Sequence, residues 1–131
     1  MDKAVWWGSL TCILLYSAIL ITALNYTGEQ NESYSIFNHF ISELGSYQIS
    51  ALAIVYNSGL ILASIGFLFF INAVFVYLTT NLSKIAFRIG ALASFICIFV
   101  GLVSEDHRLP HLIIALVFFS LLALALSLIH I

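Results

Sequence analysis

Long apolar runs alternate with short polar segments along this chain. Four runs stand out, at residues 4–24, 51–78, 85–103 and 109–129. Each is close to the ~20 residues that an α-helix needs to cross a hydrocarbon core. Lipid offers the backbone no hydrogen-bond partners, so each run is expected to be a helix. The pattern predicts an all-α integral membrane bundle of four transmembrane helices, with residues 1–131 forming a single transmembrane helical domain.

Composition supports a lipid environment. The chain is 63% hydrophobic and only 8% charged, whereas a soluble domain carries about 25% charged residues. Membrane lipids are therefore the expected surroundings and partners. The formal net charge is −2 and no basic run is present, so nucleic acid is not an expected partner. A protein partner or a homo-oligomer is left open.

The positive residues predict how the chain is oriented. Lys3 precedes the first run, Lys84 precedes the third, and Arg88 lies in the first turn of the third. Cytoplasmic loops are enriched in Lys and Arg. The N-terminus is therefore expected in the cytoplasm, in a plasma-type membrane, and the segments after the first and third runs are expected outside.

The first outer segment changes character at Ser35, where a helical pattern begins. Its apolar residues fall on one stripe: Ile36, Phe40, Ile41 and Leu44. His39, Ser42 and Glu43 are spaced i, i+3 and i+4, so they share another face. The pattern predicts a short amphipathic helix at the outer interface.

A second polar group precedes the fourth run, where Asp106 and His111 stand five positions apart. The predicted topology places it on the same side of the membrane as His39, Ser42 and Glu43. Asn57, in the outer third of the second run, is expected to lie behind them. Ionisable groups at a membrane edge are costly, so this polar cluster is a candidate site for binding a ligand.

Several chemistries suit such a cluster. His39, Asp106 and His111 are candidate ligands for zinc, with an open position for water. A His–carboxylate pair could instead perform acid–base catalysis without metal. The cluster could also bind a lipid head group or polar ligand, or stabilise the bundle through its own hydrogen bonds. No HExxH motif is present, and these alternatives stay open.

Three stretches together resemble the domain-of-unknown-function 998 family of multipass integral membrane proteins. They are "HFISELG", "YNSGLILASIGFLF" and "GLVSEDHRLPHLIIALVFF". The matching positions are Ile41 to Gly45 in the first, Asn57 and Gly59 in the second, and Gly101, Asp106 and His111 in the third. The resemblance implies about six helices and no established activity. We therefore expect this chain to be a fragment that lacks the C-terminal helices.

A weaker resemblance carries the enzymatic alternative. Ser35 and His39, with Asp106, His107 and His111, are similar to the patterns of alkaline ceramidase and adiponectin-receptor hydrolases. This implies a membrane-embedded hydrolase acting on lipids, dependent on metal or on acid–base catalysis. The leading hypothesis remains a membrane protein that binds a lipid head group or polar ligand at its outer face. A small transporter is the second alternative, disfavoured because few polar groups lie in the membrane interior.

Overall fold

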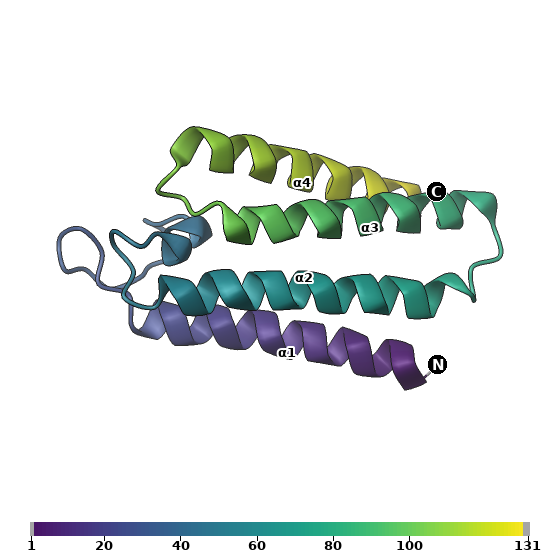
Figure 1. Ribbon diagram of the computed structural model, residues 1–131, viewed down its shortest axis with the longest axis horizontal. Coiled ribbons are helices and arrows are strands. Elements are labelled where there is room, and N and C mark those ends of the chain that lie inside the picture. Colours follow the sequence, from purple (N-terminus) through teal and green to yellow (C-terminus); the bar gives the residue numbers. More distant parts are fainter. Residues whose placement is uncertain (1, 130–131) are drawn as a thin grey trace.

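The computed structural model describes residues 2–129, which form four long α-helices. These are α1 (Asp2–Leu24), α2 (Ala53–Phe75), α3 (Asn81–Leu102) and α4 (Arg108–Ile129). Figure 1 shows them side by side along the long axis of the molecule. The predicted all-α architecture is confirmed, whereas the six-helix bundle is not shown by the described residues.

The two longer connections meet at one end of the bundle, which we call the loop end. The first loop spans residues 25–52, between α1 and α2, and the second spans residues 103–107, between α3 and α4. The N-terminus and the α2–α3 turn lie at the opposite end (Figure 1). The topology therefore brings both polar segments of the sequence to the same place.

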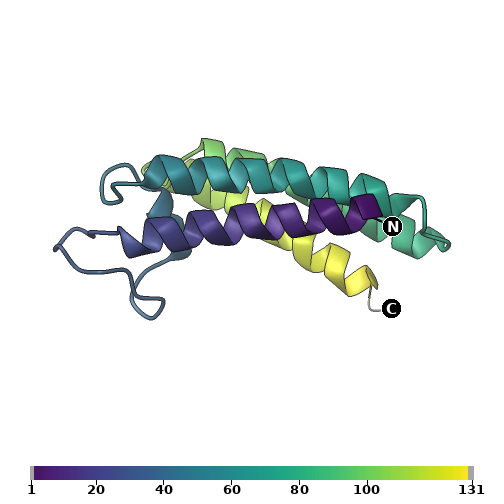
Figure 2. The same ribbon diagram turned by 90° about the horizontal axis from the view of Figure 1, so that it is seen from below.

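Each helix packs on its neighbour in the chain: α1 on α2, α2 on α3, and α3 on α4. This leaves α1 and α4 at the two edges of the bundle. Figure 2 shows α4 inclined to the other helices, and its C-terminal part packs on α3, where Ala125 is buried next to Gly90.

Small side chains form the helix contacts. The buried residues of the helices include Ala18, Gly59, Ala63, Gly66, Ala86, Gly90, Ala93 and Ala125. Large apolar side chains such as Leu20, Phe95 and Leu116 are exposed on the outside instead. This is the arrangement expected in lipid, where close backbone approach holds helices together and apolar side chains gain little by turning inward.

All four helices are long and apolar enough to cross a membrane. They indicate an integral membrane protein. Lys3, at the start of α1, and Lys84 and Arg88, at the start of α3, lie at the end opposite the loop end. Their grouping agrees with the charge argument, and the orientation itself stays a prediction.

The turn between α2 and α3 differs from the expected boundaries. α2 ends at Phe75 rather than at residue 78, and α3 begins at Asn81 rather than at residue 85. The earlier start has a local cause, because Thr80 is the N-cap of α3. Its hydroxyl accepts a hydrogen bond from the Ser83 N–H at 3.1 Å, which satisfies one of the free donors of the first turn.

The first loop contains a shorter helix than the expected amphipathic one. A 3₁₀-helix, η1, spans Ile41–Gly45, and the segment before it forms a separate turn. Phe40 has an extended backbone (φ −76°, ψ 147°), which interrupts the helical pattern. As a result the expected stripe is split: Leu44 is fully buried, whereas Ile36 and Phe40 are exposed.

Candidate functional site

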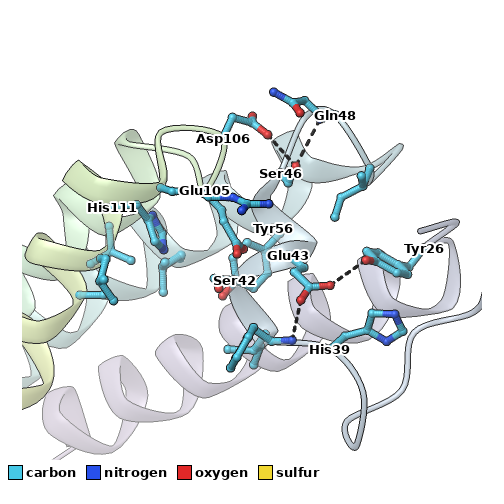
Figure 3. Close-up of a pocket in the computed structure, with 18 of the residues that line it drawn as sticks. Tyr26, His39, Ser42, Glu43, Ser46, Gln48, Tyr56, Glu105, Asp106 and His111 are labelled. Atoms are coloured by element: carbon cyan, nitrogen blue, oxygen red, sulfur yellow. Dashed lines mark hydrogen bonds between the residues drawn. The ribbon is translucent and has the colours of Figure 1, made fainter. Parts of the chain in front are cut away.

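A cleft of about 910 Å³ lies at the loop end. Both loops contribute to its lining, together with residues of α2, α3 and α4. Polar side chains gather where the loops meet, and Figure 3 shows them around the cleft. Farther along the helices the lining is apolar and includes Leu60, Val100, Ala115, Phe118 and Phe119. The cleft thus has a polar mouth and an apolar floor.

The cleft follows α4 inward from the loop end. Its lining on this helix begins at Arg108 and reaches Phe119, which corresponds to about 16 Å along the helix axis. The hydrocarbon core of a bilayer is ~30 Å thick. The cleft is therefore about as deep as one leaflet.

Asp106 joins the two loops at the mouth of the cleft. Its Oδ1 accepts a hydrogen bond from the Ser46 hydroxyl at 2.6 Å, and its Oδ2 accepts one from the Tyr47 N–H at 3.0 Å. The Ser104 hydroxyl donates to Oδ2 as well, at 2.7 Å. Burial alone would raise the pKa of Asp106, but these donors outweigh it and hold the pKa below its usual value. The carboxylate is therefore a charged clasp between residues about 60 positions apart in the chain.

Glu43 is held from two sides. Its Oε2 accepts a hydrogen bond from the Tyr26 hydroxyl at 2.9 Å, and its Oε1 accepts one from the Phe40 N–H at 3.0 Å (Figure 3). Burial and the adjacent Glu43 carboxylate raise the pKa of the Tyr26 hydroxyl. Tyr26 therefore stays a donor, and Glu43 fixes the start of η1 against the end of α1.

His39 belongs to the first loop and does not reach Asp106 or His111. Its Nδ1 accepts a hydrogen bond from the Ser35 N–H at 3.1 Å, and its Nε2 lies 3.4 Å from Glu32 Oε1. Its ring packs edge-on against Tyr26 and stacks on Tyr34. In this position His39 orders the loop beside the cleft.

His111 is buried on the first turns of α4 and lines the cleft. Its Nδ1 lies 2.6 Å from the Val103 carbonyl oxygen, so Nδ1–H is the donor of this hydrogen bond. In the neutral ring the proton is thereby fixed on Nδ1, and Nε2 is left as an acceptor. The contact also ties α4 to the end of α3.

Asn57 lies behind η1, as expected from the sequence, but it does not line the cleft. Its side-chain NH₂ donates to the Gly45 carbonyl at 2.9 Å, and both residues are buried. A Cβ added at Gly45 would overlap the Asn57 side chain, so glycine is needed for this close approach. Ser42, in contrast, is half-buried and lines the cleft.

The expected zinc set is not assembled. Within residues 2–129 no three His, Cys, Asp or Glu side chains are placed to hold a metal ion together. His39, Asp106 and His111 occupy separate parts of the close-up (Figure 3). Each forms a different contact. His39 is hydrogen-bonded within the first loop, Asp106 joins the two loops, and His111 is hydrogen-bonded to the end of α3. The three residues lie at the same end of the bundle, but the topology could not give the direction of each side chain.

Sequence reasoning missed three residues that shape the site. Ser46 and Tyr26 are the partners of Asp106 and Glu43, and no spacing rule pairs residues so far apart in the chain. Glu105 was not among the candidate residues, although it lines the cleft beside Asp106. Its Oε2 atom is buried and has no hydrogen-bond donor in the described residues.

The helices indicate the class of protein, and comparison with known protein families gives the family. Four helices that are long and apolar enough to span a membrane, with a polar cleft at one end, indicate a helical integral membrane protein. Residues 9–130 match the family described as "Protein of unknown function (DUF998)". The match covers nearly the whole chain, so the chain belongs to this family, as its motifs indicated. Comparisons with curated proteins and with solved structures give no match.

Proposed function

We propose that the protein binds one membrane lipid in the loop-end cleft, with the head group at the polar mouth and part of an acyl chain on the apolar floor. The observation that carries this proposal is the shape and lining of the cleft. Its volume of about 910 Å³ is within the range of small-molecule sites, which combine an apolar lining with a few polar groups. Its depth, about one leaflet, suits a molecule whose head group stays at the interface.

The polar mouth is rigid enough to recognise a head group. Asp106 and Glu43 are each fixed by two or more donors, and His111 is fixed by Val103. Pre-ordered groups lose little freedom when a ligand binds. The positive residues at the opposite end favour an outward-facing mouth, so the lipid would be one of the outer leaflet.

The alternatives have less support. A zinc hydrolase would need ligands that converge, and His39, Asp106 and His111 point to different partners. A transporter would need a polar path toward the other end of the bundle. The lining of this cleft is apolar at its inner end, at Leu60 and Phe119. Lipid binding therefore accounts for both ends of the cleft, whereas each alternative uses only its polar part.

A large side chain introduced into the floor of the cleft is expected to prevent lipid binding. Ala115 lines the floor on α4, and Ala115→Trp would occupy this space. Native mass spectrometry of the protein purified in mild detergent would count the phospholipids that each chain retains. We expect about one for the wild type and at least fivefold less retention for Ala115→Trp, a loss of about 1 kcal/mol or more in binding free energy.

The matched control is Ala123→Trp. Ala123 lies on the same helix, is exposed, and is absent from the cleft lining. This variant adds the same side chain to α4 and should retain lipid as the wild type does. Equal retention by all three proteins would contradict the proposal. Val100→Trp, which fills the cleft from α3, repeats the test if Ala115→Trp does not fold.

A further inference from the structure

Negative charge dominates the lining of the cleft. Its charged residues are five carboxylates and one guanidinium: Glu29, Glu32, Glu43, Glu105, Asp106 and Arg108. A low-dielectric wall strengthens the field of such groups. The mouth is therefore suited to a positive group and disfavours a ligand that carries only negative charge.

Most of these carboxylates already have donors within the protein. Asp106 accepts from Ser46, Tyr47 and Ser104, and Glu43 accepts from Tyr26 and Phe40. The pKa of Glu32 is lowered because backbone N–H groups, including that of Gln30, outweigh its burial, with His39 adding to the effect. Their charges serve to order the loops.

Glu105 differs from these three. Its Oε2 is shielded from solvent and is the one carboxylate oxygen of the described residues that is buried without a donor. Arg108 makes no ion pair with it in residues 2–129, where the ion pair found joins His39 and Glu32. A buried carboxylate oxygen without a donor is costly, and the cost is removed when a donor is supplied. Glu105 as a whole is half-buried and lines the cleft, so a rotation of its carboxylate presents this oxygen to a ligand.

We infer that the lipid of this cleft carries a primary ammonium group, which donates a hydrogen bond to Glu105. This inference rests on the proposed function. An ammonium group supplies both positive charge and N–H donors, whereas a quaternary amine supplies the charge alone. Figure 3 shows Ser42 and Tyr56 with Glu105 in the central part of the cleft. Their hydroxyl groups can accept the remaining N–H bonds.

Arg108 completes the match to a zwitterionic head group. It begins α4, lines the same cleft and follows Glu105 by three residues in the chain. A guanidinium group binds two phosphate oxygens through a pair of parallel hydrogen bonds. The N-terminus of a helix also favours the negative charge of a phosphate. A phosphodiester next to a primary amine fits Arg108 and Glu105 together. Phosphatidylethanolamine is the simplest lipid of this chemistry.

The test compares three lipids with identical acyl chains: phosphatidylethanolamine, phosphatidylcholine and phosphatidylglycerol. Binding to the purified full chain is measured by titration in native mass spectrometry. The wild type is expected to prefer phosphatidylethanolamine about tenfold, which is the effect of one charge-assisted hydrogen bond. Glu105→Gln should reduce the preference to about twofold or less. This variant should fold normally, because it removes a carboxylate that lacks a donor.

Asp2→Asn is the matched control, since it removes the same charge from an exposed position at the opposite end of the bundle, and it should keep the preference of the wild type. Glu29→Gln removes another carboxylate of the cleft and separates a specific contact from diffuse attraction. An equal loss of preference in Glu29→Gln would overturn the contact with Glu105 in favour of diffuse attraction. Equal binding of the three lipids by the wild type would also overturn the inference. If Ala115→Trp still abolished that binding, the lipid-binding cleft would stand without its head-group preference. If Ala115→Trp bound lipid normally, both proposals would fail.

Discussion

Asp106→Ala is expected to lower the free energy of unfolding by about 3 kcal/mol, because one carboxylate holds the two loops together. The substitution removes the acceptor for Ser46, Tyr47 and Ser104. The two serines are buried, so their hydroxyl groups would be left without this partner. For a chain of this size the melting temperature should fall by roughly 10 °C.

Unfolding can be followed through the buried thiol of Cys97, which reacts with a thiol-specific dye when the helices separate. Cys12 is exposed and is replaced by serine in every variant. Asp106→Asn keeps the size and one acceptor oxygen, so it should lose about half as much stability. Glu29→Ala removes an exposed carboxylate and should change the melting temperature little. A melting temperature of Asp106→Ala within about 2 °C of the wild type would contradict the clasp.

The clasp also predicts a pH dependence with a definite sign. The pKa of Asp106 is lower in the folded protein than its ordinary value of 3.8. Such a group stabilises the fold fully above its unfolded pKa, and the contribution is lost as the pH falls through the folded pKa. As the pH falls below the ordinary value of 3.8, the wild type should therefore lose more stability than Asp106→Ala. The stabilities of the two proteins should become similar at the lowest pH values, where Asp106 is protonated in the folded wild type.

The fold was largely predictable because the hydrophobic pattern is strong. Four apolar runs of transmembrane length leave helices as the natural solution, and α1 to α4 occupy them. The differences arise where hydrogen bonds and backbone geometry of neighbouring residues determine where a helix begins or ends. Thr80 starts α3 early by capping it, and the extended backbone of Phe40 divides the expected amphipathic helix. Periodicity alone does not contain these local contacts.

The candidate site was predictable only as a location. Topology correctly placed His39, Glu43, Asp106 and His111 at the same end of the bundle. It did not give their partners, because loop residues have no periodicity that fixes the direction of a side chain. Tyr26 with Glu43, and Ser46 with Asp106, are contacts that depend on the three-dimensional course of the first loop. The buried oxygen of Glu105 could not be foreseen for the same reason.

Gly59→Ala is expected to lower the free energy of unfolding by about 2 kcal/mol, although alanine is the better helix former. A Cβ added at Gly59 would overlap the Cβ of Ala18, so α1 and α2 would have to move apart. Overpacking of this kind costs about 1–3 kcal/mol. In this bundle the cost falls on the α1–α2 contact, on which the position of the first loop depends. The melting temperature, measured through Cys97 as above, should fall by roughly 8 °C.

Gly90→Ala is the matched control, because the Cβ added by the same change on α3 makes only ordinary van der Waals contacts. The nearest atom to an added Cβ there is Ile71 Cδ1, at 3.7 Å. This variant should be neutral or more stable by up to about 1 kcal/mol through helix propensity. Ala18→Gly in the Gly59→Ala background should restore most of the lost stability, because it removes the other half of the overlap. Two outcomes would contradict this prediction: equal effects of Gly59→Ala and Gly90→Ala, or no recovery in the double variant. Either would show that the close approach of α1 and α2 does not determine the stability of this bundle.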